Sequence, residues 1–280
     1  MFTQRISGVC QQVMKHPIQG DPFYRSNLRR FYPLRFYPRC FSIAQVSSNV
    51  RSGTVLTRDV LSDERLKSCI DTLKLMKVPG RIKRDLSMNN KYSVLIPFCL
   101  NEDEEPCVVL TLRSSNLSSH RSQMSFPGGQ MDEIDGNDPV KTALRETNEE
   151  IGLKADNVKV YGTLNPLPTR DSSGLIFPVI SVVNNFQMDS LEINQHEVDG
   201  VYLVKLSSLC DVSKWRYTRW DKSGLALPVY RDETFNDVSA PRVFGITALM
   251  LHFVLSSLLP EHYLFTFELF QTKVMTNKRN

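Results

Sequence analysis

The sequence lacks the cysteine pairs and the long apolar run that several protein classes need. Its six cysteines form no CxxC pair, which argues against a zinc ribbon and against a disulfide-dense secreted fold. The longest apolar candidate, residues 246–259, is interrupted by polar residues and is shorter than the roughly 20 residues of a membrane span. Because 41% of the residues are hydrophobic, the chain can build a sizeable core without disulfides. We therefore expect reduced cysteines and no membrane-spanning segment.

Acidic residues are almost absent from the first 51 residues. This segment holds eight arginines and lysines and one acid, Asp21, for a charge of +7, whereas the other 229 residues hold 26 bases and 29 acids, for −3. An Arg-rich, acid-poor leader is typical of an organellar transit peptide. We predict a mitochondrial transit peptide over residues 1–41, cleaved after Phe41, and a matrix location. The alternative is a basic arm for an anionic partner, but the acidic body gives no support for nucleic-acid binding.

We predict that the rest of the chain consists of a linker over residues 42–61, one domain over residues 62–270 and a short tail over residues 271–280. Apolar periodicity and capping signals predict three helices, over residues 63–76, 139–151 and 242–258. β-rich runs cover residues 92–99, 108–112, 158–163, 175–183, 200–204, 215–220 and 225–230. The first two runs flank a short polar loop and are expected to form a hairpin-like pair. Strands, a helix, more strands and a closing helix indicate an α/β sandwich around a mixed sheet.

The helix predicted over residues 139–151 has strong local signals at both ends. Asp138 is suited to the N-cap and Pro139 to the first helical position. Gly152 is placed to end the helix in a left-handed conformation. An apolar stripe suited to packing on a sheet runs along it through Val140, Leu144, Thr147 and Ile151.

The other face of this helix gathers carboxylates. Glu146 and Glu150 are one turn apart, Glu149 is adjacent to both, and Arg145 is placed to neutralise and orient Glu149. Such a pair of carboxylates suits a magnesium or manganese ion. The double glycine at residues 128–129 would let backbone approach the metal or a phosphate closely. A solvated acidic face is the alternative interpretation.

These residues carry a resemblance to a known family. The segment is similar to the Nudix box through Arg145-Glu146-x-x-Glu149-Glu150-x-Gly152-Leu153 and the preceding Gly128-Gly129. The loop before Arg145 is two residues longer than in the family pattern, and Asp132, Glu133 and Asp135 are candidates for its missing loop glutamate. The upstream stretch resembles the signature of the coenzyme A diphosphatases through Leu110–Ser114, Leu117, His120, Gln123 and Phe126–Gly129. One residue departs from that signature, because Ser122 stands where it has glycine.

The resemblance implies a Nudix fold, an α/β/α sandwich with a mixed sheet, and a metal-dependent hydrolase of nucleoside diphosphate derivatives. It implies that Glu146, Glu150 and the carbonyl of Gly129 bind Mg²⁺ or Mn²⁺. It further implies catalytic roles for Glu150, for Glu149 and for Arg145, which would hold Glu149 in place.

The signature implies coenzyme A or acyl-coenzyme A as the small-molecule substrate, split into 3′,5′-adenosine diphosphate and 4′-phosphopantetheine or its acyl derivative. Arg113 and His120 are the candidates for contacts to the nucleotide phosphates. Glu197 is a weaker candidate for a general base. Two other functions stay open: hydrolysis of NADH, ADP-ribose or capped RNA, and a catalytically silent nucleotide-binding domain.

Overall fold

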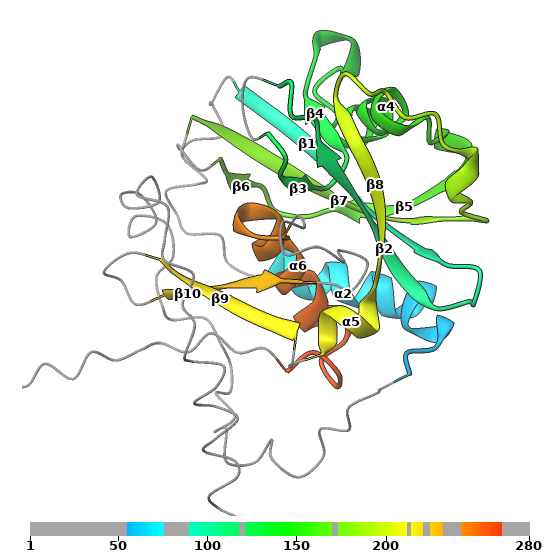
Figure 1. Cartoon of the computed structure of the whole chain (residues 1–280), viewed down its shortest axis with the longest axis vertical. Coiled ribbons are helices and arrows are strands. Elements are labelled where there is room, and N and C mark those ends of the chain that lie inside the picture. Colours follow the sequence, from blue (N-terminus) through cyan, green and yellow to red (C-terminus); the bar gives the residue numbers. More distant parts are fainter. Residues whose placement is uncertain are drawn as a thin grey trace, which may run out of the picture.

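A computed structural model describes residues 55–75, 90–117, 121–169, 173–211, 214–220, 225–231 and 242–264 (Figure 1). Its strands are β1 (Asn90–Leu100), β2 (Pro106–Arg113), β3 (Met124–Ser125), β4 (Gly128–Gln130), β5 (Val158–Thr163), β6 (Leu167–Pro168), β7 (Gly174–Val183), β8 (Val198–Lys205), β9 (Trp215–Trp220) and β10 (Leu225–Tyr230). Its α-helices are α2 (Asp63–Leu75), α4 (Pro139–Ile151), α5 (Leu206–Cys210) and α6 (Gly245–Leu258). Short 3-10 helices are η4 (Arg58–Leu61), η5 (Glu133–Asp135), η6 (Ala155–Asn157) and η7 (Met188–Ser190).

The main sheet is mixed, as the sequence predicts. β1 pairs antiparallel with β2 and parallel with β7, while β5 pairs antiparallel with β7. β8 lies along β2, and the short strand β4 pairs with β1. β9 and β10 form a separate antiparallel hairpin. The predicted pairing of the first two strands is therefore confirmed.

Two helical layers cover opposite faces of this sheet (Figure 1). On one face, Leu95 of β1 packs with Ala143 of α4 and Val179 of β7. On the other, Ile96 belongs to a larger apolar cluster with residues of α2 and α6. Neighbouring residues of β1 point to opposite faces, as the pleat of a strand requires. The architecture is the predicted α/β/α sandwich.

The ends of the domain differ from the sequence prediction in two places. The last helix begins at Gly245, not at residue 242, because Val243 forms a β-bridge with Tyr230 and cannot also be helical. The core also reaches into the predicted linker, where Leu56 and Val60 are buried around η4. The predicted leader (residues 1–41) and tail (residues 271–280) lie outside the described residues.

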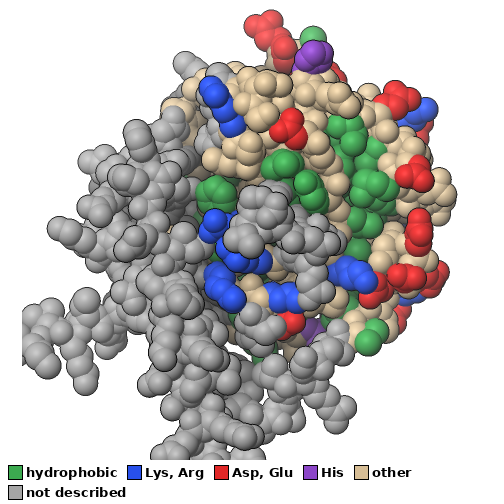
Figure 2. All heavy atoms as spheres, viewed as in Figure 1, with side chains coloured by type: hydrophobic (Ala, Val, Ile, Leu, Met, Phe, Trp, Pro, Cys, Tyr) green, Lys and Arg blue, Asp and Glu red, His purple; other side chains and the backbone are tan. Residues whose placement is uncertain are grey.

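The surface of the described part carries both signs of charge. Acidic side chains lie along the right-hand edge of the space-filling view, and basic side chains gather near its centre (Figure 2). Within the described ranges, no helix is both long enough and apolar enough to cross a membrane.

Candidate active site

The double glycine brings a strand and a helix into close contact. Gly129 in β4 pairs with Ser93 in β1, and α4 lies against both strands. Gly128 has a φ of +144°, and a Cβ atom there would lie 2.3 Å from the carbonyl oxygen of Ser93. A Cβ atom on Gly129 would lie 2.1 Å from the carboxylate of Glu146. Only glycine at residue 129 therefore lets this carboxylate rest against the strand backbone.

The caps of α4 are those that the sequence predicts. The Asp138 carboxylate accepts a hydrogen bond from the Val140 amide at 2.9 Å, and Pro139 occupies the first turn. Gly152 ends the helix at a φ of +70°. Since both ends are fixed, the carboxylates in its last two turns have defined positions.

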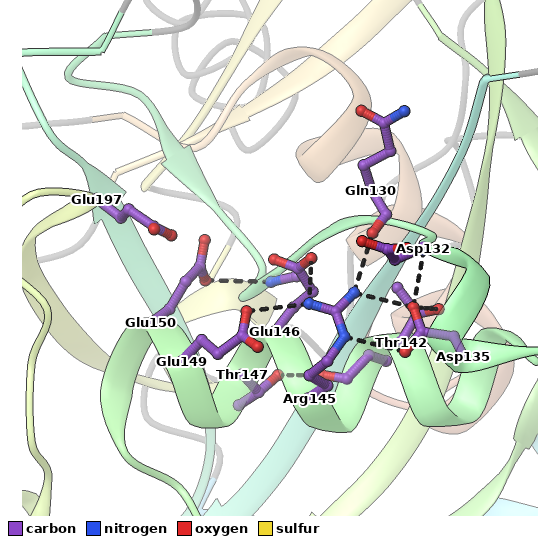
Figure 3. A network of polar contacts seen from close by, with 12 residues as sticks. Gln130, Asp132, Asp135, Thr142, Arg145, Glu146, Thr147, Glu149, Glu150 and Glu197 are labelled. Atoms are coloured by element: carbon purple, nitrogen blue, oxygen red, sulfur yellow. Dashed lines mark hydrogen bonds and ion pairs between the residues drawn. The ribbon is translucent and has the colours of Figure 1, made fainter.

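Arg145 is the hub of the polar network (Figure 3). Its guanidinium donates two hydrogen bonds of 2.9 Å to Asp135 and one of 3.2 Å to the carbonyl of Gln130. It also lies 2.9 Å from Glu146 and 3.0 Å from Glu149. The predicted contact between Arg145 and Glu149 is present, but it is one of several.

Asp135 is a structural partner and not a free loop ligand. It is 3% exposed and also accepts hydrogen bonds from the Asp132 amide and the Thr142 hydroxyl. Its bonds to Arg145 hold the pKa of this carboxyl well below its usual range. Asp135 therefore anchors the long loop to α4. Of the other two candidates for the missing loop glutamate, Asp132 caps η5 and Glu133 is exposed.

The three glutamates of α4 do not form one solvated acidic face, so the alternative interpretation of these residues is wrong. The side chain of Glu149 is 52% exposed, that of Glu146 only 15% and that of Glu150 only 4%. The reason is that β4 lies against α4, with Gly129 next to the carboxylate of Glu146 and Gly128 bonded to Glu150. Glu150 accepts a hydrogen bond of 3.1 Å from the amide of Gly128.

Burial is the main cause of the pKa shifts of Glu146 and Glu150. Burial is the main cause that raises the pKa of Glu150 to about 8; the Gly128 amide and Arg113 oppose this shift, and the nearby Glu146 and Glu197 add to it. Burial also raises the pKa of Glu146, although Arg145 opposes this shift. The pair thus lacks enough positive charge to balance it.

Glu197 faces this pair from a loop that is bound to the end of α4 (Figure 3). The amide of Asn194 donates to the carbonyl of Glu150 at 2.9 Å, and the amide of Glu192 donates to that of Ile151 at 3.1 Å. Glu197 follows on this loop just before β8 and acts electrostatically on Glu146 and Glu150. No local pattern signals this placement, because it depends on the loop's bonds to the helix end.

The two predicted substrate contacts have different outcomes. Arg113 ends β2, and its guanidinium lies 3.9 Å from the carboxylate of Glu150. It therefore belongs to the same cluster as the glutamates. His120 lies outside the described residues. Ser122, which follows it closely, adopts a φ of +51°.

The inner carboxylates fit a divalent cation by their chemistry. Glu146 and Glu150 are hard oxygen donors that lie beside the backbone of β4, where Glu150 is buried and Glu146 is partly buried. Across the described ranges, however, no three His, Cys, Asp or Glu side chains are already close enough to hold an ion. A cation here would thus draw on the two glutamates together with backbone, water or substrate oxygens.

Comparisons with known proteins agree with this geometry. The model of the NUDIX domain matches residues 89–225. Mitochondrial coenzyme A diphosphatase NUDT8 of Mus musculus is 36% identical over 176 residues, which cover 61% of this chain and 79% of that protein. Nudix hydrolase 3 of Caenorhabditis elegans is 33% identical over 227 residues, 77% of this chain and 91% of that protein. This chain belongs to the Nudix hydrolase family.

As a Nudix hydrolase, the chain is an enzyme that hydrolyses diphosphate substrates, and the predicted family, fold and reaction class are confirmed. Enzymes of this family generally use divalent metal ions. Among solved structures, a MutT/nudix family protein from Enterococcus faecalis matches with a TM-score of 0.39 at 13% identity, over 71% of this chain and 75% of that one. The family assignment depends on the sequence relatives.

Proposed function

We propose that this Nudix hydrolase is a coenzyme A diphosphatase that requires Mg²⁺ or Mn²⁺. It splits coenzyme A or acyl-coenzyme A into 3′,5′-adenosine diphosphate and 4′-phosphopantetheine or its acyl derivative. The observation that carries the proposal is the carboxylate pair of the partly buried Glu146 and the buried Glu150, packed against the glycines of β4. The upstream signature and the 36% identity to NUDT8 support the choice of substrate.

In this proposal Glu146, Glu150 and the carbonyl oxygen of Gly129 hold the metal. When bound, the metal supplies an activated water and screens the charge of the diphosphate. Glu149 is the exposed member of the set, and Arg145 orients its carboxylate at 3.0 Å. The same guanidinium keeps Glu146 in place at 2.9 Å, so Arg145 serves two of the three glutamates.

Glu197 is the candidate general base. It is half-buried, it faces Glu150, and its loop is hydrogen-bonded to the end of α4. A carboxylate in this position could take a proton from a water at the diphosphate. Arg113 and His120 are the proposed contacts to substrate phosphates, because a guanidinium and an imidazole both donate hydrogen bonds to such oxygens.

A second candidate function is hydrolysis of another nucleoside diphosphate derivative, such as NADH, ADP-ribose or capped RNA. Ser122 favours it, because this residue departs from the coenzyme A signature. The third alternative, a catalytically silent domain, is not proposed, because the chain is a Nudix hydrolase and retains the three glutamates and Arg145 of the box.

A substrate panel tests the proposed function. The full chain is assayed with Mg²⁺ and with Mn²⁺ against coenzyme A, acetyl-coenzyme A, ADP-ribose, NADH and capped RNA, and products are identified by mass spectrometry. We expect the highest kcat/KM for a coenzyme A compound, with 3′,5′-adenosine diphosphate as product. A preference for NADH or ADP-ribose of about tenfold or more contradicts the substrate assignment and supports the second candidate.

We also propose that the enzyme acts in the mitochondrial matrix. The leader has a charge of +7 over 51 residues, and a basic segment is drawn toward the negative side of an energised membrane. The similarity to a relative named as mitochondrial supports the same location.

A further inference from the structure

Arg113 lies beside the carboxylate cluster, next to Glu150. It is the last residue of β2, and its guanidinium is 3.9 Å from Glu150, which is an ion-pair distance but too long for a hydrogen bond. Its side chain is 28% exposed, so it lies at the border between the cluster and solvent, although its Nε atom is buried. This position therefore favours a contact to a phosphate next to Glu146 and Glu150, the proposed metal ligands, over a contact to a more distant phosphate of the nucleotide.

One donor of this guanidinium has no acceptor. Among the described residues, the Nε atom of Arg113 is buried and makes no hydrogen bond. A buried donor without an acceptor is rare in native proteins and often marks the place of a ligand. A phosphate group presents several oxygens, and the planar fork of an arginine can bind two of them at once.

The main chain of Arg113 is fixed on both sides. Its amide donates to the carbonyl of Gln123 at 3.1 Å, and its carbonyl accepts from the amide of Ser122 at 3.0 Å. On the other edge, the register between β2 and β8 shifts at Arg113, and the next amide, that of Ser114, donates to the carbonyl of Glu197 at 2.8 Å. These bonds tie Arg113 to the loop that carries Glu197.

The turn at Ser122 makes the first pair of these bonds possible. Ser122 has a φ of +51°, a left-handed conformation that glycine adopts far more readily than serine. Side-chain packing does not account for this conformation, since Ser122 is exposed. Strained residues of this kind are held in place by their surroundings and cluster at functional sites. Here the strained residue donates directly to the carbonyl of Arg113.

We propose that Arg113 contacts the reacting diphosphate beside Glu150, and that the Ser122 turn is the device that positions it. This inference rests on the proposed diphosphatase function. Arg113 then stabilises charge that develops on the diphosphate during cleavage. Every candidate substrate contains that diphosphate, so Arg113 contributes to rate on all of them and does not select coenzyme A.

Kinetics on two substrates test the role of Arg113. We expect Arg113→Ala to lower kcat by about 100-fold or more on both coenzyme A and ADP-ribose, with KM changed by less than about threefold. Arg113→Lys should recover part of the loss, because it keeps the charge but not the fork. Arg121→Ala is the matched control, since Arg121 is an exposed base in the same loop and should keep kcat.

Comparing the loss of kcat on coenzyme A with the loss on ADP-ribose distinguishes a failure of this inference from a failure of the proposed function. A loss in Arg113→Ala that appears only with coenzyme A, or only in KM, overturns the inference and makes Arg113 a specificity contact. A wild-type enzyme that prefers ADP-ribose refutes the proposed substrate, yet an equal loss on both substrates still supports the role of Arg113.

A double-mutant cycle tests the turn. Ser122→Gly should keep kcat and raise Tm, because glycine adopts this conformation without strain. Ser122→Val should lower kcat, because a β-branched residue disfavours a φ of +51°. In an Arg113→Ala background, Ser122→Val should lower kcat no further. An equal loss in both backgrounds shows that the turn does not act through Arg113 and overturns that part of the proposal.

Discussion

Replacing Glu150 by glutamine should stabilise the metal-free enzyme at neutral pH and abolish its activity. The Glu150 side chain is 4% exposed, and its pKa rises from the ordinary 4.5 to about 8 in the folded protein. The folded state thus holds this proton more tightly than the unfolded state. Compared with a side chain that stays neutral, Glu150 costs no stability well below pH 4.5. The folded protein then loses stability steadily as the pH rises from about 4.5 toward 8.

The size of the effect follows from that shift. At pH 7 most folded molecules carry a protonated Glu150, and burying this carboxyl costs about 3 kcal/mol of unfolding free energy. Glutamine has nearly the same shape and can still accept from the Gly128 amide, but it carries no charge. The stability difference between Glu150→Gln and wild type should rise from about 1 kcal/mol at pH 5 to about 4 kcal/mol at pH 8.

Urea unfolding with a chelator, at pH 5 and pH 8, measures this difference. Adding Mn²⁺ should stabilise the wild type and not the variant, because a ligand stabilises only a state that binds it. Glu149→Gln is the control: its side chain is 52% exposed, so its stability should change by less than about 1 kcal/mol at either pH. A Glu150→Gln protein that is less stable than wild type at pH 8, or a difference that does not grow with pH, refutes the reasoning.

Three further predictions concern other parts of the chain. Gly129→Ala should lower kcat by about 100-fold or more in steady-state assays, because its methyl group would displace the carboxylate of Glu146. Asp135→Asn should lower the free energy of unfolding by about 3 kcal/mol in urea titrations, because it removes the charge from a nearly buried ion pair. A fluorescent protein fused to residues 1–50 should enter mitochondria, and the native protein should begin near Ser42.

For each of these three predictions, a specific result would contradict the reasoning. Near wild-type turnover in Gly129→Ala would show that the carboxylate does not need its place against β4. Unchanged stability in Asp135→Asn would mean that other contacts of Arg145 suffice to anchor the loop. A cytosolic or peroxisomal signal, or an intact Met1 on the native protein, would exclude the proposed import.

Local signals account for the elements that the sequence predicted well. α4 has its predicted bounds because its N-cap, its proline and its terminal glycine are all encoded within a few residues of its ends. The start of α6 was missed because the bridge between Tyr230 and Val243 joins segments that are separate in the sequence. Apolar periodicity alone extends a helix through such a residue.

The active site likewise has features that local sequence signals predict and features that depend on contacts between distant segments. The spacing of residues 145–150 identified the carboxylates, but not that Glu150 is buried while Glu149 is exposed, because the packing of β4 against α4 decides that. The bond between Arg145 and Asp135 spans ten residues and a loop. A buried arginine with more donors than its helix neighbours can satisfy is the signal that could have found it.

Binding of Mn²⁺ tests the central claim most directly, namely that Glu146 and Glu150 of α4 hold the catalytic metal. Titrations followed by electron paramagnetic resonance would compare wild type with Glu146→Gln, Glu150→Gln and Glu149→Gln. We expect the first two variants to bind Mn²⁺ at least about tenfold more weakly and to lose nearly all turnover, while Glu149→Gln stays within about threefold of wild-type affinity. Folded Glu146→Gln and Glu150→Gln proteins that bind Mn²⁺ as tightly as wild type would contradict the claim.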